Sequence, residues 1–396
     1  MEITFWILFG VVVYTFAGYA ILLAILLSVK KMLGMKRKDR SAVYESLPQV
    51  CLFVTAYNES DYVDAKVKNM LSLNYPSDKI QYLWITDGSD DGTPDKLKQY
   101  PMMEVHHLAE RRGKIHAMNR GMKFVKAPIV IFSDSNTTLC PEAVSIIVKT
   151  FSDPTVGCIA GEKRIFTHKV DSAAGSGENL YWKFESWVKR MDSELNSTVG
   201  AAGELFAIRT SLFTEVENDT ILDDFIISLR IAKKGYTIAY TPDAYAIETA
   251  SVNVKEELKR KVRIAAGGLQ TVVRLKELLN PFRYGWLSIQ YISHKVLRWT
   301  LAPIALFMLF FVNFLILLQG SLNNAEVPLF YVLFFYLQLF MYLLALLGWA
   351  MERWKIRFKI LFVPFYFTAM NYAAVKGWIR FLKGRQSVNW EKSKRA

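Results

Sequence analysis

The chain has 396 residues, of which 52% are hydrophobic, and a formal net charge of +13 at pH 7. Because the apolar residues concentrate near the two ends, the composition excludes a purely soluble protein and indicates one soluble domain of roughly 220 to 250 residues with a membrane part. The basic excess lies in residues 30–40, 352–359 and 376–396, which carry +5, +3 and +6 and leave the rest of the chain at −1, so nucleic acid is not the expected partner.

The first predicted element is a membrane span in residues 1–29. Ile3 to Val29 carries no charge, and about 20 apolar residues are enough for a helix to cross a bilayer. Basic residues follow this run instead of preceding it, which favours a span over a cleaved signal peptide. Since positive charge marks the cytoplasmic side, we expect an integral inner-membrane protein with its N-terminus outside and the domain after Lys30 in the cytoplasm.

Residues 30–254 are predicted to form that cytoplasmic domain, in which apolar strands alternate with helices. The predicted strands are Val50–Thr55, Gln81–Thr86, Pro128–Ser133 and Val156–Ala160, and Asp61–Leu73 has helical spacing. This alternation predicts an α/β fold with a mostly parallel sheet. In such sheets ligands bind beyond the carboxyl ends of the strands.

Carboxylates at the predicted strand ends are candidate ligands for a divalent cation. Asp87 and Asp134 each close a strand, and hard cations prefer oxygen ligands. A structural turn is the alternative interpretation of the Asp87–Thr93 loop. Polar residues recur at three strand ends, and this recurrence favours a functional site.

Two charged clusters add to the candidate chemistry. Arg111–Lys114 is a compact basic segment that could stabilise charge on a leaving diphosphate, although a solvated patch has the same composition. Asp223 and Asp224 precede an apolar helix, and either could act as a general base. A helix cap is the alternative reading of this pair, and the two roles are compatible.

Residues 255–300 are predicted to contain amphipathic helices at the membrane interface. Within Lys255–Leu279 the apolar positions on one stripe are Leu258, Val262, Ala265, Leu269 and Val272. This stripe could lie among lipid headgroups or dock onto the catalytic domain.

Residues 301–350 contain two further predicted spans, Leu301–Leu318 and Pro328–Ala350. In residues 351–396, Phe358–Val375 is apolar enough for a fourth span, but crossing there would place the basic tail outside. Since Pro364 and Asn371 interrupt the run, a re-entrant segment is the alternative.

An ordered set of motifs resembles the family 2 glycosyltransferases. In chain order the motifs are Asn58–Glu59, Asp87–Thr93, Arg112–Lys114, Asp134–Asn136, Gly200–Glu204 and Leu222–Asp224. With its flanking spans, the chain looks like the membrane-integrated synthases of cellulose, hyaluronan and poly-N-acetylglucosamine. The resemblance implies a nucleotide-binding sheet of the glycosyltransferase A type, inversion at the anomeric carbon, and a Mg²⁺ or Mn²⁺ ion.

The resemblance also implies residue roles by matching position. The donor-binding residues would be Tyr57, Glu59, Asp87, Arg112, Lys114, Arg260 and Arg263. Asp134 and Asn136 would hold the metal. Asp224 would be the catalytic base, with Asp223 as its neighbour. Gly203 and Glu204 would lie near the acceptor.

Two positions depart from the family pattern. Asn136 stands where the family has a second aspartate, and an amide oxygen is a weaker cation ligand than a carboxylate. Processive members carry Gln-x-x-Arg-Trp where this chain has Arg260–Ile264, so an aromatic surface for a sugar is missing there. Arg298–Trp299 offers a similar dipeptide later in the chain.

The expected activity is therefore transfer of N-acetylglucosamine or glucose from a UDP-sugar to a growing polysaccharide. The alternative is addition of a single sugar to a lipid acceptor, such as a polyprenyl phosphate, a glycerolipid or a sphingolipid. A scaffold protein that kept the sheet but lost turnover is a rival from another class. The expected reaction leaves room for a partner subunit.

Overall fold

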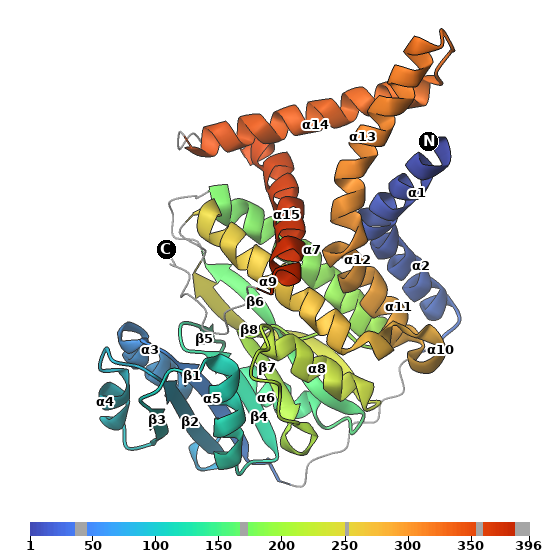
Figure 1. The fold of residues 1–396 in the computed structure, drawn as a ribbon. Coiled ribbons are helices and arrows are strands. Elements are labelled where there is room, and N and C mark those ends of the chain that lie inside the picture. The colour runs from blue at the N-terminus through green and yellow to red at the C-terminus, as the bar shows by residue number, and fades with distance from the viewer. Residues whose placement is uncertain (36–45, 167–172, 250–252, 354–358, 385–396) are drawn as a thin grey trace.

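The computed structural model describes residues 1–35, 46–166, 173–249, 253–353 and 359–384. An α/β domain lies on one side, and long apolar helices extend from it on the other (Figure 1). Parts of the three basic stretches, residues 36–40, 354–358 and 385–396, lie outside the described residues, as does Phe358, the first residue of the fourth predicted apolar run.

The strands of the described residues form one eight-stranded sheet in the order β3-β2-β1-β4-β7-β6-β8-β5. Their bounds are β1 Val50–Ala56, β2 Ile80–Asp87, β3 Met103–Leu108, β4 Ile129–Asp134, β5 Thr138–Leu139, β6 Val156–Phe166, β7 Leu205–Arg209 and β8 Thr237–Thr249. Strands β3, β2, β1 and β4 are parallel, as are β6 and β8, whereas β7 is antiparallel to both its neighbours and β5 is antiparallel to β8. The predicted α/β class with a mostly parallel sheet is confirmed, with mixed strands in its second half.

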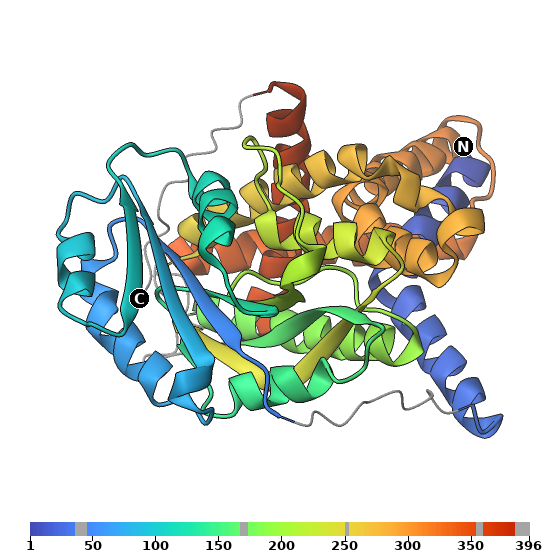
Figure 2. The ribbon, with the colours of Figure 1, turned by 90° about the horizontal axis from the view of Figure 1, so that it is seen from below.

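Helices cover both faces of the sheet (Figure 2). They are α3 Ser60–Leu71, α4 Thr93–Lys98, α5 Lys114–Gly121, α6 Ala143–Thr150, α7 Ala173–Leu195, α8 Asp223–Lys233 and α9 Val254–Arg274. Alternate residues of β1 point to opposite faces: Leu52 and Val54 pack in the cluster that includes α3 and α6, and Phe53 packs in the one that includes α5 and α8. Because β1 is buried on both faces, its sequence is a nearly continuous apolar run.

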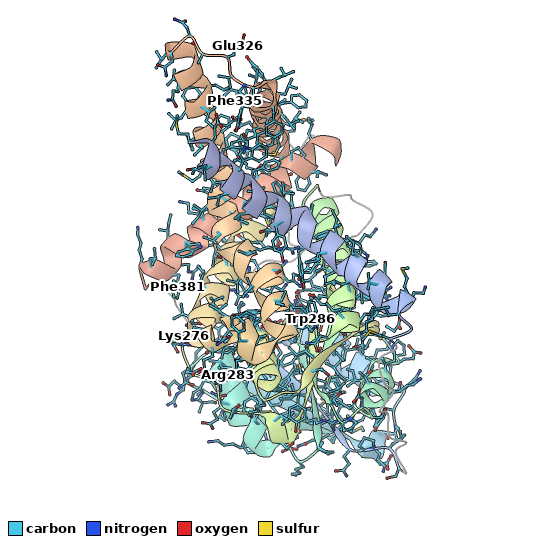
Figure 3. The ribbon with its side chains drawn as sticks, turned by 90° about the vertical axis from the view of Figure 1, so that its right-hand side faces the viewer. Lys276, Arg283, Trp286, Glu326, Phe335 and Phe381 are labelled. Atoms are coloured by element: carbon cyan, nitrogen blue, oxygen red, sulfur yellow. The ribbon has the colours of Figure 1, made fainter. Side chains whose placement is uncertain are left out.

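Three helices are long and apolar enough to cross a membrane, among the described residues: Glu2–Met32, α13 Leu301–Leu322, and Leu329–Glu352 within α14 (Leu329–Arg353). The first consists of α1 Glu2–Val13, a π-helical turn η1 Tyr14–Gly18, and α2 Tyr19–Met32. Glu326 lies in the connection between α13 and α14, which is the end of these two helices farthest from the sheet (Figure 3).

The segment that joins the sheet domain to α13 is broken into short turns. It contains η5 Lys276–Leu279, α10 Pro281–Tyr284, α11 Trp286–Tyr291, the π-helical turn η6 Ile292–Val296, and α12 Leu297–Trp299. The N-terminal helix reaches the same region, because the Tyr14 hydroxyl of η1 lies 2.7 Å from the Ser293 hydroxyl of η6. The N-terminal helix and the connection to α13 therefore lie side by side.

The amphipathic helix α9 is docked onto the protein rather than exposed as a surface helix. Its second half is buried, and α15 (Lys359–Leu382) packs across it. The Tyr366 hydroxyl of α15 donates to Glu257 of α9 at 3.4 Å, and the Trp378 indole donates to the Trp299 carbonyl at 2.8 Å. The fourth apolar run is thus a helix with Pro364 inside it, and it is not among the three helices that meet the criteria for a span.

Candidate active site

The carboxyl ends of three parallel strands meet at one edge of the sheet. In the strand register Thr55 of β1 pairs with Asp134 of β4, and Ala56 pairs with Thr86 of β2. The polar residues that follow β1, and those that close β2 and β4, are therefore neighbours. This is the arrangement that the alternating sequence pattern predicts.

Asp87 organises the loop that precedes α5. Its Oδ2 accepts hydrogen bonds from the backbone N–H groups of Arg112 at 2.9 Å and Gly113 at 2.7 Å. Gly88 has a φ of +70°, and a Cβ there would lie 2.5 Å from the Arg111 Cβ. Close approach of the two loops thus requires glycine, and Asp87 fixes the backbone immediately before Lys114.

We expect Asp87→Ala to lower the free energy of unfolding by about 2 kcal/mol, because two N–H groups lose their acceptor in a largely buried loop. Thermal unfolding of the purified protein in detergent measures this change. Asp95→Ala is the control, since Asp95 lies on the exposed surface of α4 and pairs only across a solvated turn with Lys98. Equal melting temperatures for the two variants would contradict the assigned role of Asp87.

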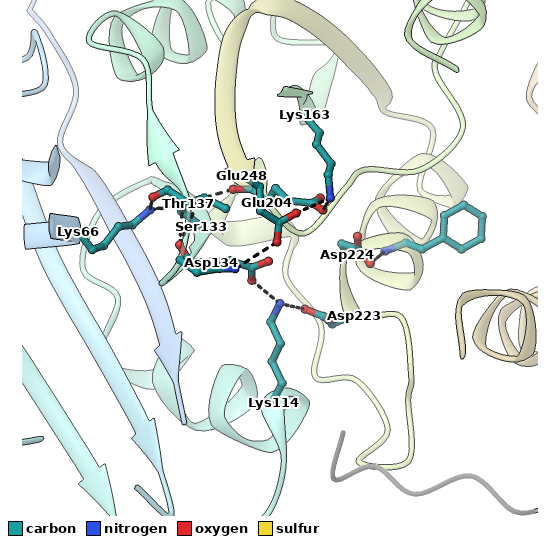
Figure 4. Close-up of polar contacts among 12 residues, drawn as sticks. Lys66, Lys114, Ser133, Asp134, Thr137, Lys163, Glu204, Asp223, Asp224 and Glu248 are labelled. Atoms are coloured by element: carbon teal, nitrogen blue, oxygen red, sulfur yellow. Dashed lines mark hydrogen bonds and ion pairs between the residues drawn. The ribbon is translucent and has the colours of Figure 1, made fainter. Parts of the chain in front are cut away.

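Lys114 links two of the candidate carboxylates (Figure 4). Its Nζ lies 2.9 Å from Asp134 Oδ1 and 3.4 Å from Asp223 Oδ2. Burial alone would lower the pKa of Lys114, but the attraction of these carboxylates outweighs it and raises the pKa. Lys114 is therefore a permanent cation in the centre of the site.

Asp224 lies at the start of α8, one residue beyond Asp223. Its Oδ1 accepts a hydrogen bond from the Phe225 backbone N–H at 2.8 Å. Burial, together with the Asp223 carboxylate, raises the pKa of Asp224 to about 7. A carboxyl group with this pKa can take up and release a proton near neutral pH, as a general base must.

Gly203 leaves space between the base and the cation. A Cβ at this position would lie 3.5 Å from both Asp224 Oδ2 and Lys114 Nζ. The backbone of Gly203 therefore lies beside both groups without a side chain of its own to cover them. A hydroxyl-bearing substrate could approach Asp224 along this face.

A second network lies beside this group, and two of its members, Lys163 and Glu248, were missed from the sequence. Lys163 of β6 donates to Glu204 and to Glu248 of β8, each at 2.5 Å, and Asn136 Nδ2 donates to Glu248 Oε1 at 3.2 Å. Burial alone would raise the pKa of Glu204, but Lys163 and Arg260 lower it well below its usual range. The available signal for Lys163 was the run of three charged residues, Glu162–Arg164, that directly follows the apolar first half of β6.

The two arginines predicted on α9 differ in their surroundings. Arg260 is buried and donates through Nε and Nη2 to the Glu257 carboxylate at 2.9 and 3.0 Å. Burial lowers the pKa of Arg263, and this effect exceeds the opposite effect of the Asp223 and Asp224 carboxylates. Arg263 and the acidic pair therefore line the same cavity and interact electrostatically, whereas Arg260 forms an ion pair with Glu257 on its own helix.

Most of the predicted site residues line one cavity of about 1090 Å³. Eleven of the thirteen do so: Tyr57, Glu59, Lys114, Asp134, Asn136, Gly203, Glu204, Asp223, Asp224, Arg260 and Arg263. Asp87 and Arg112 are not in its lining. Asp87 instead accepts hydrogen bonds from the backbone of the neighbouring loop. The Arg112 side chain forms an ion pair with Glu110 at 2.5 Å on the exposed side of that loop.

The donor set fits a divalent cation that shares its ligands with a substrate. Asp134 and the amide oxygen of Asn136 offer two oxygen ligands in the cavity wall, and Mg²⁺ is commonly held by one or two side chains plus substrate phosphates. Within the described residues no group of three or more His, Cys, Asp or Glu side chains is arranged to hold a metal alone. Phosphate oxygens would therefore have to complete the coordination.

Comparison with known proteins agrees with this geometry. Poly-beta-1,6-N-acetyl-D-glucosamine synthases of Staphylococcus aureus (strain MSSA476) and Staphylococcus epidermidis are 27% and 25% identical to the chain over 238 and 239 residues, 58% of this chain. The matched part spans 57% of the length of these relatives. The fold is similar to that of the mannosyltransferase PcManGT from Pyrobaculum calidifontis, solved in complex with GDP-Man and Mn²⁺, with a TM-score of 0.66 and 21% identity over 96% of this chain and 99% of that one.

Residues 48–267, which carry all the predicted site residues, match the family described as glycosyltransferase like family 2. The match covers more than half of the chain and ends within α9. The chain therefore belongs to glycosyltransferase family 2 and has a sheet domain of the glycosyltransferase A type joined to apolar helices long enough to cross a membrane.

Proposed function

We propose that this protein is an inverting, metal-assisted glycosyltransferase that moves a sugar from a UDP-sugar to a growing polysaccharide. One observation carries the proposal: Lys114, Asp134 and Asp224 line one cavity, although Lys114 and Asp224 are 110 residues apart in the sequence. UDP-N-acetylglucosamine is the favoured donor, because the curated relatives are named as N-acetylglucosamine polymer synthases. UDP-glucose is the alternative donor.

In the proposed reaction Asp224 takes the proton of the acceptor hydroxyl as the oxygen bonds to the anomeric carbon. The bond from that carbon to the diphosphate breaks on the opposite side, so a single displacement inverts the configuration. Lys114 and Arg263 supply fixed positive charge for the departing nucleoside diphosphate. A Mg²⁺ or Mn²⁺ ion bound with the diphosphate would be held by Asp134 and Asn136 and would neutralise part of its charge.

The donor and the stereochemistry can be tested together. Purified protein is incubated with Mg²⁺ or Mn²⁺ and with UDP-sugars in turn, and nucleotide release identifies the donor. The anomeric configuration of the new linkage is then read by NMR. A product that keeps the configuration of the donor would contradict a single displacement with Asp224 as base.

We expect the rate of transfer to depend on the ionisation of Asp224. Because its pKa is raised to about 7, kcat/KM should fall about tenfold for each pH unit below that value. Asp223→Asn removes the neighbouring charge that raises this pKa, so the acidic limb should move to lower pH. A pH–rate profile of each protein measures the shift, and identical limbs would contradict the coupling.

The same shift sets a pH dependence of stability. The folded protein holds the Asp224 proton up to about pH 7, whereas an unfolded carboxyl releases it near 3.8. This group's contribution to stability is therefore present below pH 3.8 and is lost as the pH rises to about 7.

Addition of a single sugar to a lipid is the second candidate, and the shape of the cavity favours it. Beyond the charged residues the cavity wall continues over Phe16, Phe367 and Met370, from the N-terminal helix and α15. Ile264, where processive members have tryptophan, also lines it. Sizing the products of a radiolabelled UDP-sugar separates the two candidates, since a ladder of lengths indicates polymerisation and one short product indicates single addition.

We also propose that the sheet domain faces the cytoplasm at the inner membrane. Lys30 and Lys31 at the end of α2, on the domain side of the first apolar helix, support this orientation. Protease digestion of intact spheroplasts and of inverted vesicles tests it. Cleavage of the sheet domain in intact spheroplasts would contradict the orientation.

A further inference from the structure

The end of the cavity nearest the apolar helices carries a second group of charges. We call it the basic cluster: Lys189 and Glu185 on α7, Lys295 in η6, and Arg298 in α12, all of which line the cavity. The Glu185 carboxylate accepts hydrogen bonds from Lys295 and, at 3.0 Å, from Arg298 Nη1. Of these residues only Arg298, in the dipeptide Arg298–Trp299, was noted in the comparison with the family motifs.

The basic cluster has more positive than negative charge. Lys189 is only 6% exposed, and within the described part of the chain no carboxylate forms an ion pair with it. Its Nζ lies 5.5 Å from the centre of the Trp182 ring and 6.0 Å from that of Tyr240. The cluster therefore contains three cations, of which Lys189 is buried and Lys295 and Arg298 are 13% and 14% exposed, and one carboxylate, Glu185, which also lies 3.2 Å from His294 Nε2.

The acidic side chains near the basic cluster already form hydrogen bonds with other residues. Asp192, one turn beyond Lys189 on α7, accepts from Tyr19 at 2.5 Å and lies 2.6 Å from Nδ1 of His294. Glu162 accepts from Ser186 at 2.6 Å and from Tyr240. Because a buried charge without a partner is costly, the excess of cations favours an anion bound in the cavity.

The wall next to the basic cluster is apolar and reaches the surface. The rings of Phe16 on η1 and Phe367 on α15 are in edge-to-face contact, with centroids 4.9 Å apart. Val363, one turn before Phe367 on α15, lines the cavity and is 48% exposed. An apolar chain could therefore leave the cavity along α15 past Val363, beside the touching rings of Phe16 and Phe367.

We propose that the basic cluster binds the phosphate group of a lipid-linked acceptor, whose hydrocarbon chain leaves along α15 past Val363, beside Phe16 and Phe367. The inference rests on the proposed glycosyltransferase activity, in the form of the second candidate, transfer to a lipid, and specifies the class of that lipid. A phosphate suits one arginine and two lysines, because charge-assisted hydrogen bonds to phosphate are strong and the excess charge matches a dianion. A neutral glycerolipid would leave the excess charge of the cluster unbalanced.

The test is equilibrium binding of a radiolabelled polyprenyl monophosphate to the full-length protein in detergent micelles. Lys189→Gln removes a charge and keeps most of the side chain's length, and Lys183→Gln on the exposed side of the same helix is the matched control. We expect Lys189→Gln to weaken binding about tenfold or more and Lys183→Gln to leave it unchanged. The unphosphorylated polyprenol should compete about tenfold less well, and millimolar inorganic phosphate should not displace the lipid.

Three results would overturn the inference: binding to Lys189→Gln equal to that of the unsubstituted protein, equal competition by the polyprenol, or full displacement by inorganic phosphate. The last result would identify a site for free phosphate. Nucleotide release from the UDP-sugar is measured in parallel on the unsubstituted protein. Lysine-dependent lipid binding without any nucleotide release would support the basic cluster as a phosphate site and overturn the proposed transferase function.

Discussion

Asp224→Asn should lower kcat for sugar transfer about a thousandfold while leaving the fold intact, because loss of a general base typically costs 10² to 10⁴ in rate. Asparagine has nearly the same shape, and its side-chain oxygen can still accept the hydrogen bond that Asp224 Oδ1 receives from the Phe225 N–H. It cannot take a proton from the acceptor hydroxyl. Initial rates of transfer and of nucleotide release, measured with saturating donor, give the loss.

The control for this variant is Asp219→Asn. Asp219 is mostly exposed and pairs with Arg274 at 2.6 Å outside the cavity, so its substitution should leave the transfer rate unchanged. Asp224→Asn also removes a charge that burial makes unfavourable, and its melting temperature should be no lower than that of the unsubstituted protein. Undiminished transfer by a well-folded Asp224→Asn protein would reject Asp224 as the base.

The parts of the site that were predictable from the sequence lie at strand ends. The apolar runs that became β1, β2 and β4 are short and end in polar residues, and parallel strands bring those ends to one edge. The contact of Lys114 with Asp134 and Asp223 follows from this arrangement, because α5 and α8 both begin beside that edge. The local pattern of an apolar strand followed by polar residues therefore predicted that residues distant in the chain share one site.

The Lys163 network could not be predicted in the same way. Lys163, Glu204 and Glu248 come from three segments separated by more than 40 residues, and they meet only through the pairing of β6 with β7 and β8. The register of β6 with β8 shifts between Gly161 and Glu162, just before Lys163. A bulge of this kind changes which side chains face inward, and the sequence pattern alone does not locate it.

The position of Trp299 was also beyond the sequence pattern. The dipeptide Arg298–Trp299 directly precedes the predicted span Leu301–Leu318, and in the structure it lies in the separate short helix α12, which ends at Trp299, whereas α13 begins at Leu301. The Trp299 ring packs where Gly268 of α9 has no side chain and meets Phe225 edge to face at 5.1 Å. Trp299 and Ile264 line the same cavity, so an aromatic side chain is present near the position where the family motif places one.

Lys163→Met should be the most destabilising of the substitutions considered, with a loss of about 3 to 5 kcal/mol, because it removes the shared partner of two buried carboxylates. The Lys163 side chain is 1% exposed and those of Glu204 and Glu248 are 13% and 2% exposed. Methionine has a similar volume, so the loss would come from the uncompensated charges and not from a cavity. A fall in apparent melting temperature on the order of 10 °C in detergent would measure it.

Lys98→Met provides the matched comparison, since Lys98 pairs with Asp95 at 2.9 Å on the solvated surface of α4 and an exposed pair contributes about 0 to 1 kcal/mol. Adding Glu204→Gln and Glu248→Gln to Lys163→Met should recover most of the lost stability, because no buried carboxylate would then lack a counter-charge. If the triple variant melts as low as Lys163→Met alone, packing around residue 163 and not charge balance holds β6 against β8. Recovery would instead show that a cation is needed at position 163 because Glu204 and Glu248 are shielded from water in the cavity wall. Glu248 also accepts a hydrogen bond from the Asn136 amide of the candidate metal site, so this charge balance extends to that site.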